Sequence, residues 1–151
     1  MLEHMILPFY RYTDFHGRSR RKEFWSFAVL NVLVMAILVS LAFSTGFSHR
    51  ALIQHAEFAG SLGIATIAFF AILGMYSLAT LVPSVAVNVR RLHDRDMSGW
   101  WCLAFVVLGM VPVIGWVASI FYLVMMVLPG TPGANRFGED PRDPAGSQMF
   151  V

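Results

Sequence analysis

The sequence predicts an all-α, polytopic transmembrane helical bundle with two full spans plus a kinked span or re-entrant hairpin. Hydrophobic residues make up 57% of the 151 residues and charged residues only 13%, which is far from the average composition of soluble proteins. The mean hydropathy is +0.64. Three long runs, within residues 24–43, 61–89 and 100–128, carry no charged side chain. In a bilayer such runs fold as helices, because the backbone must satisfy its own hydrogen bonds there.

The first run, residues 24–43, predicts a complete membrane span. Its twenty residues correspond to about 30 Å of helix, which matches the thickness of the hydrocarbon layer. The basic stretch Arg18 to Lys22 precedes it, and no short apolar region with a small-residue cleavage site is present. We therefore expect this run to be retained as an anchor and not removed as a signal peptide.

The second run predicts a full span at residues 61–83. The uncharged stretch continues to Val89, but Pro83 removes a backbone donor, so we expect the helix to emerge into the headgroup layer beyond it. Between the first two runs, within residues 44–60, apolar side chains recur at helical spacing and polar side chains occupy the opposite face. A short interfacial helix with Ser48 as its cap is expected there.

The third run, residues 100–128, is too long for one straight span. As a single helix it would need a tilt of about 45°, beyond the usual range. Gly109, Pro112 and Gly115 lie at its centre, where proline and glycine permit a turn or a kink. The sequence thus predicts a break near 109–116, and it favours a short hairpin over the alternative of one kinked span.

The basic residues close to the spans predict the orientation. Five lie in residues 1–23 and three in the loop after the second run, whereas residues 44–60 contain only Arg50. We therefore expect 1–23 to be a cytoplasmic, basic interfacial segment that precedes a transmembrane domain at 24–128. With a hairpin at 100–128, residues 129–151 form a cytoplasmic tail. Three tryptophans then lie at the cytoplasmic interface, where indole rings are favoured: Trp25, Trp100 and Trp101.

Three polar motifs remain outside the spans. They are FHGRSRRKEFW at residues 15–25, RRLHDRDMSGWW at 90–101 and GTPGANRFGEDP at 130–141. Together, and in this order, they closely resemble the domain of unknown function 805 family of small bacterial inner-membrane proteins, over about residues 9–141. The resemblance implies a multi-pass protein of the bacterial plasma membrane with a few transmembrane helices, and no assigned activity.

The hairpin arrangement brings all three motifs to the cytoplasmic headgroup layer. Guanidinium groups bind phosphate in a fork, so anionic lipid headgroups or a partner protein are the expected ligands of this motif face. The alternative is that the arginines only set the orientation. The residues assigned to lipid or partner binding are Arg18, Arg21, Arg90, Arg91, His93, Asp94 and Arg136.

Acidic residues in the motifs suggest that the motifs also bind one another. We expect Glu23, Asp94 and Asp140 each to pair with an arginine from another motif and so to tie the helix ends together. The positions assigned to a structural role are Gly17, Glu23, Trp25, Ser98, Gly99, Trp100, Trp101, Asn135, Phe137, Gly138 and Asp140.

His93 and Asp94 are an adjacent histidine and carboxylate, a pair that can act as acid and base or bind a metal. Zinc requires three or four ligands, and only His16 is a further candidate in these motifs. Cys102, the single cysteine, is expected to be a small buried hydrophobe. The sequence therefore assigns no catalytic residue, no metal site and no cofactor.

A polar stripe in the second run suggests a second class of function. Ser77, Thr80, Ser84 and Asn88 fall on one face of a helix, and Asn31 in the first run is placed to hydrogen-bond across to it. Such stripes mark helix packing or, as the sharper alternative, a transport path. No ionisable residue lies within the apolar runs, so ion-coupled transport lacks its usual signature.

These observations predict a non-enzymatic membrane module that binds anionic lipid or a partner protein through its cytoplasmic motif face. The alternatives are a small transporter or channel component and, third, an enzyme that acts on a membrane-embedded substrate. The expected partner is the lipid bilayer and not nucleic acid, because the basic residues gather beside the spans. So thin a bundle would gain packing by forming a homo-oligomer.

Overall fold

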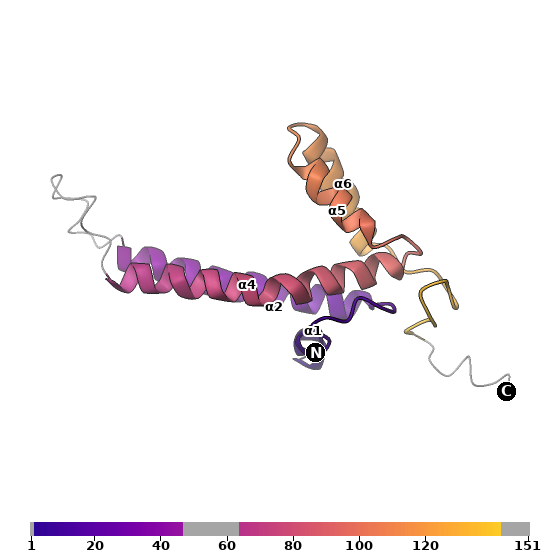
Figure 1. Ribbon diagram of the computed structural model, residues 1–151, viewed down its shortest axis with the longest axis horizontal. Helices are drawn as coiled ribbons and strands as arrows, with labels where there is room; N and C mark the ends of the chain where they lie inside the picture. The colour runs from indigo at the N-terminus through magenta and orange to yellow at the C-terminus, as the bar shows by residue number, and fades with distance from the viewer. Residues whose placement is uncertain (1, 47–63, 143–151) are drawn as a thin grey trace. The chain divides into compact units, whose positions relative to one another are not determined.

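The computed structural model describes residues 2–46 and 64–142. Over these residues the chain is helical apart from its loops, with one isolated bridge between Asn135 and Gly138, and the predicted all-α class is confirmed. The interfacial helix predicted within 44–60, with Ser48 as its cap, falls largely outside the described residues. The helices are α1 (Leu2–Tyr10), α2 (Arg21–Gly46), α4 (Ile64–His93), α5 (Trp100–Gly109) and α6 (Ile114–Val127) (Figure 1).

Two helices are long and apolar enough to cross a membrane. They contain the candidate spans Arg21–Ser44 and Ile67–His93. The described residues form two compact units, one comprising 28–81 and the other comprising those up to Phe27 and from Val82 onward. In the first of these units α2 and α4 pack together, and the Tyr76 hydroxyl donates to Asn31 Oδ1 at 3.0 Å. Large apolar side chains such as Leu78 stay exposed, as lipid-facing helix surfaces require.

Helix α4 continues through Pro83 to His93. A proline is tolerated within a transmembrane helix because neighbouring groups satisfy the backbone around it. Arg90, Arg91 and His93 of the second motif therefore lie on the last turn of a helix and not in a loop. Their relative directions are fixed by the helix, which decides how the candidate site is assembled.

The third apolar run forms two helices, as the favoured hairpin requires. Helices α5 and α6 pack side by side (Figure 1), and the chain turns between them at residues 110–113. Val113 adopts φ 67° and ψ −56°, and the Ile114 N–H donates to Pro112 O at 2.8 Å. These are the features of a γ-turn with positive φ, a rare and strained conformation.

Gly115 allows the two helices to meet, which gives a first testable prediction. A Cβ at Gly115 would lie 2.7 Å from the backbone oxygen of Gly109, so the backbones must separate to accommodate it. We expect Gly115→Ala to lower the free energy of unfolding by about 1–3 kcal/mol, the usual cost of overpacking. Gly109→Ala is the matched control, because its Cβ would meet nothing within 4 Å. Equal thermal midpoints for the two variants in detergent would refute the prediction.

Helix α1 was not predicted, since residues 1–23 were assigned only as a basic interfacial segment. The helix is nine residues long and contains Pro8, so local preference gives a weak signal. Tertiary packing holds it instead, because the ring of Phe9 lies edge-on to Phe27 with centroids 5.4 Å apart. Phe9 thereby joins the small hydrophobic core, whose buried members are Phe24, Phe27, Val87, Leu92 and Met126.

Candidate functional site

The three polar motifs converge at the ends of α2, α4 and α6. Their centre is a group of buried, charged side chains, here named the arginine–carboxylate cluster: Arg18, Glu23, Arg90, Arg91 and Asp94. None of the five residues is more than 6% exposed. Such a group is stable only when each charge meets an opposite charge or a hydrogen-bond partner.

Asp94 lies between two guanidinium groups. Arg18 Nε donates to Oδ1 at 2.9 Å, and Arg91 Nη1 donates to Oδ2. The other two nitrogens of Arg18 reach the third motif, where Nη1 donates to Gly133 O at 2.6 Å and Nη2 to Thr131 O at 2.5 Å. The planar guanidinium group of Arg18 thus binds the second and the third motif at the same time.

Arg91 caps the carboxyl end of α6. Its Nη2 donates to Leu128 O, and its Nε lies 3.4 Å from Met126 O. The last carbonyls of a helix lack partners within the helix and carry partial negative charge, so a guanidinium there satisfies both needs. Because α5 begins inside the second motif at Trp100, both ends of the α5–α6 hairpin lie at this motif.

Arg90 joins the second motif to the first. Its Nη2 lies 3.1 Å from Glu23 Oε1 in a buried ion pair, and the Ser19 N–H donates to Arg90 O at 3.1 Å. The predicted pairing between motifs is therefore present for Glu23 and Asp94. Asp140 differs, because Oδ1 accepts at 3.2 Å from Nε of Arg142, which directly follows the third motif and belongs to no other motif.

Asp140 organises its own turn. Its carboxylate also accepts from the backbone N–H groups of Arg142 at 2.9 Å and Gly133 at 3.3 Å. Burial raises the pKa of Asp140, but these hydrogen bonds and the Arg142 charge outweigh burial and hold the pKa below its usual value.

The third motif closes over the second through Asn135 and Phe137. Asn135 Nδ2 donates to His93 O at 2.9 Å, and its Oδ1 accepts from the Phe137 N–H at 2.9 Å. The Phe137 ring then stacks on His93, with centroids 3.9 Å apart and planes within 5°. Asn135 and Gly138 exchange backbone hydrogen bonds of 3.0 Å, with Gly138 at φ 136°, a conformation that favours glycine.

His93 and Asp94 do not form the hydrogen-bonded pair that acid–base chemistry would use. His93 Nδ1 lies 3.2 Å from Gly17 O, and both oxygens of Asp94 face arginines. Gly17 itself has φ 77°, which explains the glycine at that position. The geometry around Asp94 is that of a structural ion pair.

The remaining basic residues of the predicted motif face are exposed. Arg136 pairs with Asp96, with Nε 3.1 Å from Oδ1 and side chains 60% and 47% exposed. Arg21 donates through Nη1 to Val127 O at 3.2 Å. Trp100 is exposed at the start of α5, and so is Trp101, whose backbone N–H donates to Ser98 O.

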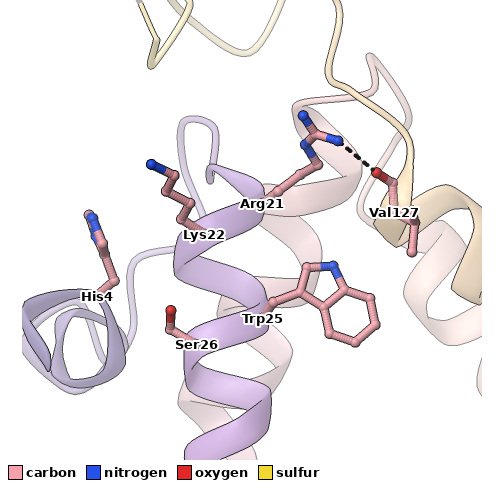
Figure 2. A pocket seen from close by; sticks show the side chains of 6 residues that line it. All are labelled: His4, Arg21, Lys22, Trp25, Ser26 and Val127. Carbon is pink, nitrogen blue, oxygen red and sulfur yellow. Dashed lines mark hydrogen bonds between the residues drawn. The ribbon is translucent and has the colours of Figure 1, made fainter. Parts of the chain in front are cut away.

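Arg21 lines an open pocket of about 600 Å³ on the surface near the start of α2. Figure 2 shows Arg21 and Trp25 extending toward Val127, and Lys22 and Ser26 on the side that faces His4 of α1. Arg21, Lys22 and Trp25 are exposed. Two cations beside an indole make this pocket suited to a phosphate group at a membrane surface.

The polar stripe of α4 bonds mainly to its own helix. Ser77 Oγ donates to Leu73 O at 2.8 Å, and Thr80 Oγ1 donates to Tyr76 O at 2.9 Å. Asn88 Nδ2 donates to Ser84 O at 2.8 Å, while its Oδ1 accepts from Tyr122. Asn31 bonds to Tyr76, which lies beside the stripe and is not one of its four members.

Sequence reasoning missed four residues of the site. Thr131 donates its N–H to Asp94 O at 2.8 Å, Ser19 donates to Arg90 O, and Asp96 binds Arg136. Gly130 packs against the Asp94 carboxylate. Gly130 and Thr131 open the third motif, so their place in a glycine-rich turn was visible, whereas their partners were not.

Comparisons with known proteins identify the family of the chain and several relatives. Residues 12–139 match the family described as Protein of unknown function (DUF805). The chain is 37% identical over 131 residues to Inner membrane protein YhaH of Escherichia coli (strain K12), covering 87% of this chain and 89% of that protein. Inner membrane protein YhaI of the same strain is also 37% identical, with 87% and 88% covered. Uncharacterized protein YiiR is 30% identical over 148 residues, with 86% and 87% covered. No solved structure matches the chain.

Proposed function

We propose that this chain, which belongs to the DUF805 family of proteins of unknown function, is a non-enzymatic membrane module that binds anionic lipid headgroups. The arginine–carboxylate cluster ties the helix ends together, and the exposed pocket of Arg21, Lys22 and Trp25 holds the headgroup. The observation that carries the proposal is a difference in burial among the basic residues. Arg18, Arg90 and Arg91 are buried against partners in the chain, whereas Arg21 and Lys22 remain open to the surface.

The module resides in the bacterial inner membrane with a cytoplasmic N-terminus. Relatives named inner membrane proteins support the location, and the basic residues before α2 and after α4 support the orientation. Helices α5 and α6 form a re-entrant hairpin, because at ten and fourteen residues they reach only about 15 and 21 Å. A hydrocarbon layer of about 30 Å exceeds either length.

A phosphate fits the pocket for reasons of charge and hydrogen bonding. Arg21 uses one of its N–H donors for Val127 O, which leaves the others of the fork for a ligand. Lys22 adds a second positive charge, and Ser26 and His4 add polar groups to the lining. Trp25 provides an indole ring, which is favoured at headgroup depth. In the described part of the pocket lining no acidic residue opposes an anion.

The test measures phosphatidylglycerol binding to the purified full chain in detergent by native mass spectrometry, with phosphatidylcholine as the neutral comparison. We expect the wild-type protein to prefer phosphatidylglycerol. Lys22→Gln should reduce its affinity about fivefold, since a basic residue near an anionic lipid surface contributes about 1 kcal/mol. The double variant Arg21→Gln with Lys22→Gln should abolish the preference.

Arg20→Gln is the matched control for this experiment. Arg20 is exposed and adjacent in sequence, and it is not among the lining residues of the pocket. The affinity of the Arg20→Gln variant for phosphatidylglycerol should stay within twofold of the wild-type affinity. Equal binding of both lipids to the wild type, or an equal loss in Arg20→Gln, would refute the proposed site.

A further inference from the structure

A second pocket lies beside His93 and differs from the first in its chemistry. It measures about 560 Å³, within the usual range for small-molecule sites. Its lining is almost entirely apolar and includes Phe15, Val89 and Leu103, while no arginine, lysine or carboxylate contributes to it. A charged headgroup would therefore meet no counter-charge in this pocket.

His93 adds a polar ring to this largely apolar lining. A carbonyl oxygen can only accept, so the 3.2 Å contact with Gly17 O requires the hydrogen of the ring on Nδ1. In the neutral ring Nε2 then carries a lone pair.

Gly99 lies close to this nitrogen and lines the same pocket. A Cβ at Gly99 would lie 3.4 Å from His93 Nε2 and 2.7 Å from Val89 Cγ1, so a larger residue would push the loop away. The loop therefore passes close to α4, and His93, Ser98 and Gly99 line the same pocket. Close packing against α4 is therefore a second reason for a glycine at position 99, besides its place before the first residue of α5.

Ser98 supplies the second polar group of the pocket. Its Oγ accepts from the Trp100 N–H at 3.5 Å, which leaves the hydroxyl hydrogen free to rotate toward a ligand. One acceptor, His93 Nε2, and one donor, Ser98 Oγ, are thus present in a neutral and apolar lining. A single group that both donates and accepts a hydrogen bond matches this pair.

We propose that the pocket lined by His93 and Ser98 binds the free hydroxyl of a neutral lipid of the diacylglycerol class. The hydroxyl donates to His93 Nε2 and accepts from Ser98 Oγ, and the acyl chains lie against Leu103 and Val106. The site is distinct from the basic pocket of Arg21 and Lys22. It needs no charge on the ligand and no chemical step.

The test titrates 1,2-dioctanoylglycerol and its 3-O-methyl ether into the full chain in detergent, with native mass spectrometry as the readout. The ether keeps the chains and the oxygen but carries a methyl group in place of the hydroxyl hydrogen, so it can accept a hydrogen bond and cannot donate one. We expect the alcohol to bind about tenfold more tightly, as one or two hydrogen bonds in an apolar site provide. His93→Asn should bring the two affinities within twofold of each other. The asparagine amide can still donate to Gly17 O, so the fold keeps that contact.

A steric variant tests the place of binding without touching His93. Leu103→Trp should fill the pocket and reduce binding of both compounds at least tenfold, whereas Val107→Trp should leave binding unchanged. Leu103 and Val107 are each 54% exposed, and only Leu103 lines the pocket. Thermal midpoints close to wild type identify the folded variants.

Four outcomes would overturn the proposal. Equal affinity of the wild type for alcohol and ether would leave only a groove for acyl chains. A preference unchanged in His93→Asn would place the hydroxyl elsewhere. Tighter binding of decanoic acid than of dioctanoylglycerol would indicate a carboxylate site, and no binding of either glyceride would leave no lipid site at all.

Discussion

Replacing Asp94 by asparagine is expected to lower the free energy of unfolding by about 3–5 kcal/mol, the usual cost of leaving buried charges without their partner. Asparagine has nearly the same shape, so packing is unchanged. Its amide, however, offers one oxygen where Arg18 and Arg91 both need an acceptor. One guanidinium must then face an N–H₂ group, and both lose the opposing charge. The thermal midpoint in detergent should fall by roughly 10 °C for a chain of this size.

Asp96→Asn is the control for this experiment. The substitution is the same and the position is two residues away, but Asp96 and Arg136 form an exposed pair, with side chains 47% and 60% accessible. Exposed pairs contribute about 0–1 kcal/mol, so the midpoint should change by only a few degrees. A stable Asp94→Asn variant, or equal losses at both positions, would mean that the cluster does not hold the helix ends together.

The sequence was sufficient to predict a break in the third run and to favour a hairpin over one kinked span, because the signals for a break are local. Gly109, Pro112 and Gly115 interrupt an apolar run that is too long for one span, and the structure turns at residues 110–113. Pro83 was expected to mark the end of the full span, with the helix emerging beyond it into the headgroup layer. Helix α4 runs on to His93, since a proline weakens a helix without ending it where other groups satisfy the backbone.

Helix α1 shows where local signals were insufficient. A nine-residue segment with an internal proline gives only a weak helix signal from propensity. Its position depends on the contact of Phe9 with Phe27. That contact can be predicted only when the start of α2 is known. Tertiary packing of this kind overrides local preference and is not encoded in the segment itself.

The sequence indicated which charged residues pair with one another better than it indicated which backbone groups they bind. Glu23 and Asp94 were expected to pair with arginines of other motifs, and they do. Many of the donors of Arg18 and Arg91, however, meet backbone carbonyls of Gly133, Thr131 and Leu128. Backbone groups have no sequence signature, so these contacts are recognised only when the three segments are placed together. Because these contacts occupy Arg18 and Arg91, the proposal of lipid binding rests on Arg21 and Lys22 instead.

Gly130 is the position where the cluster leaves least room, and Gly130→Ala should have the second large effect on stability. A Cβ there would lie 1.9 Å from Asp94 Oδ2 and 2.3 Å from its Cγ, distances that no relaxation of a methyl group can accommodate. The carboxylate is held from both sides by Arg18 and Arg91, so it cannot rotate away without breaking an ion pair. The variant must either displace residues 130–133 or open the cluster.

Both routes lose contacts of the same kind. Moving the segment removes the hydrogen bonds from Arg18 to Gly133 O and from Thr131 N–H to Asp94 O, while moving the carboxylate uncouples Asp94 from an arginine. We expect a loss of about 3 kcal/mol or more, since overpacking alone costs about 1–3 kcal/mol and buried hydrogen bonds are lost with it. Gly74→Ala is the control, because its Cβ would meet nothing within 4 Å and alanine favours a helix. A Gly130→Ala protein whose thermal midpoint in detergent matches that of Gly74→Ala would show that the third motif does not press on Asp94. Contacts other than the one between Gly130 and Asp94 would then have to hold the third motif against the helix ends.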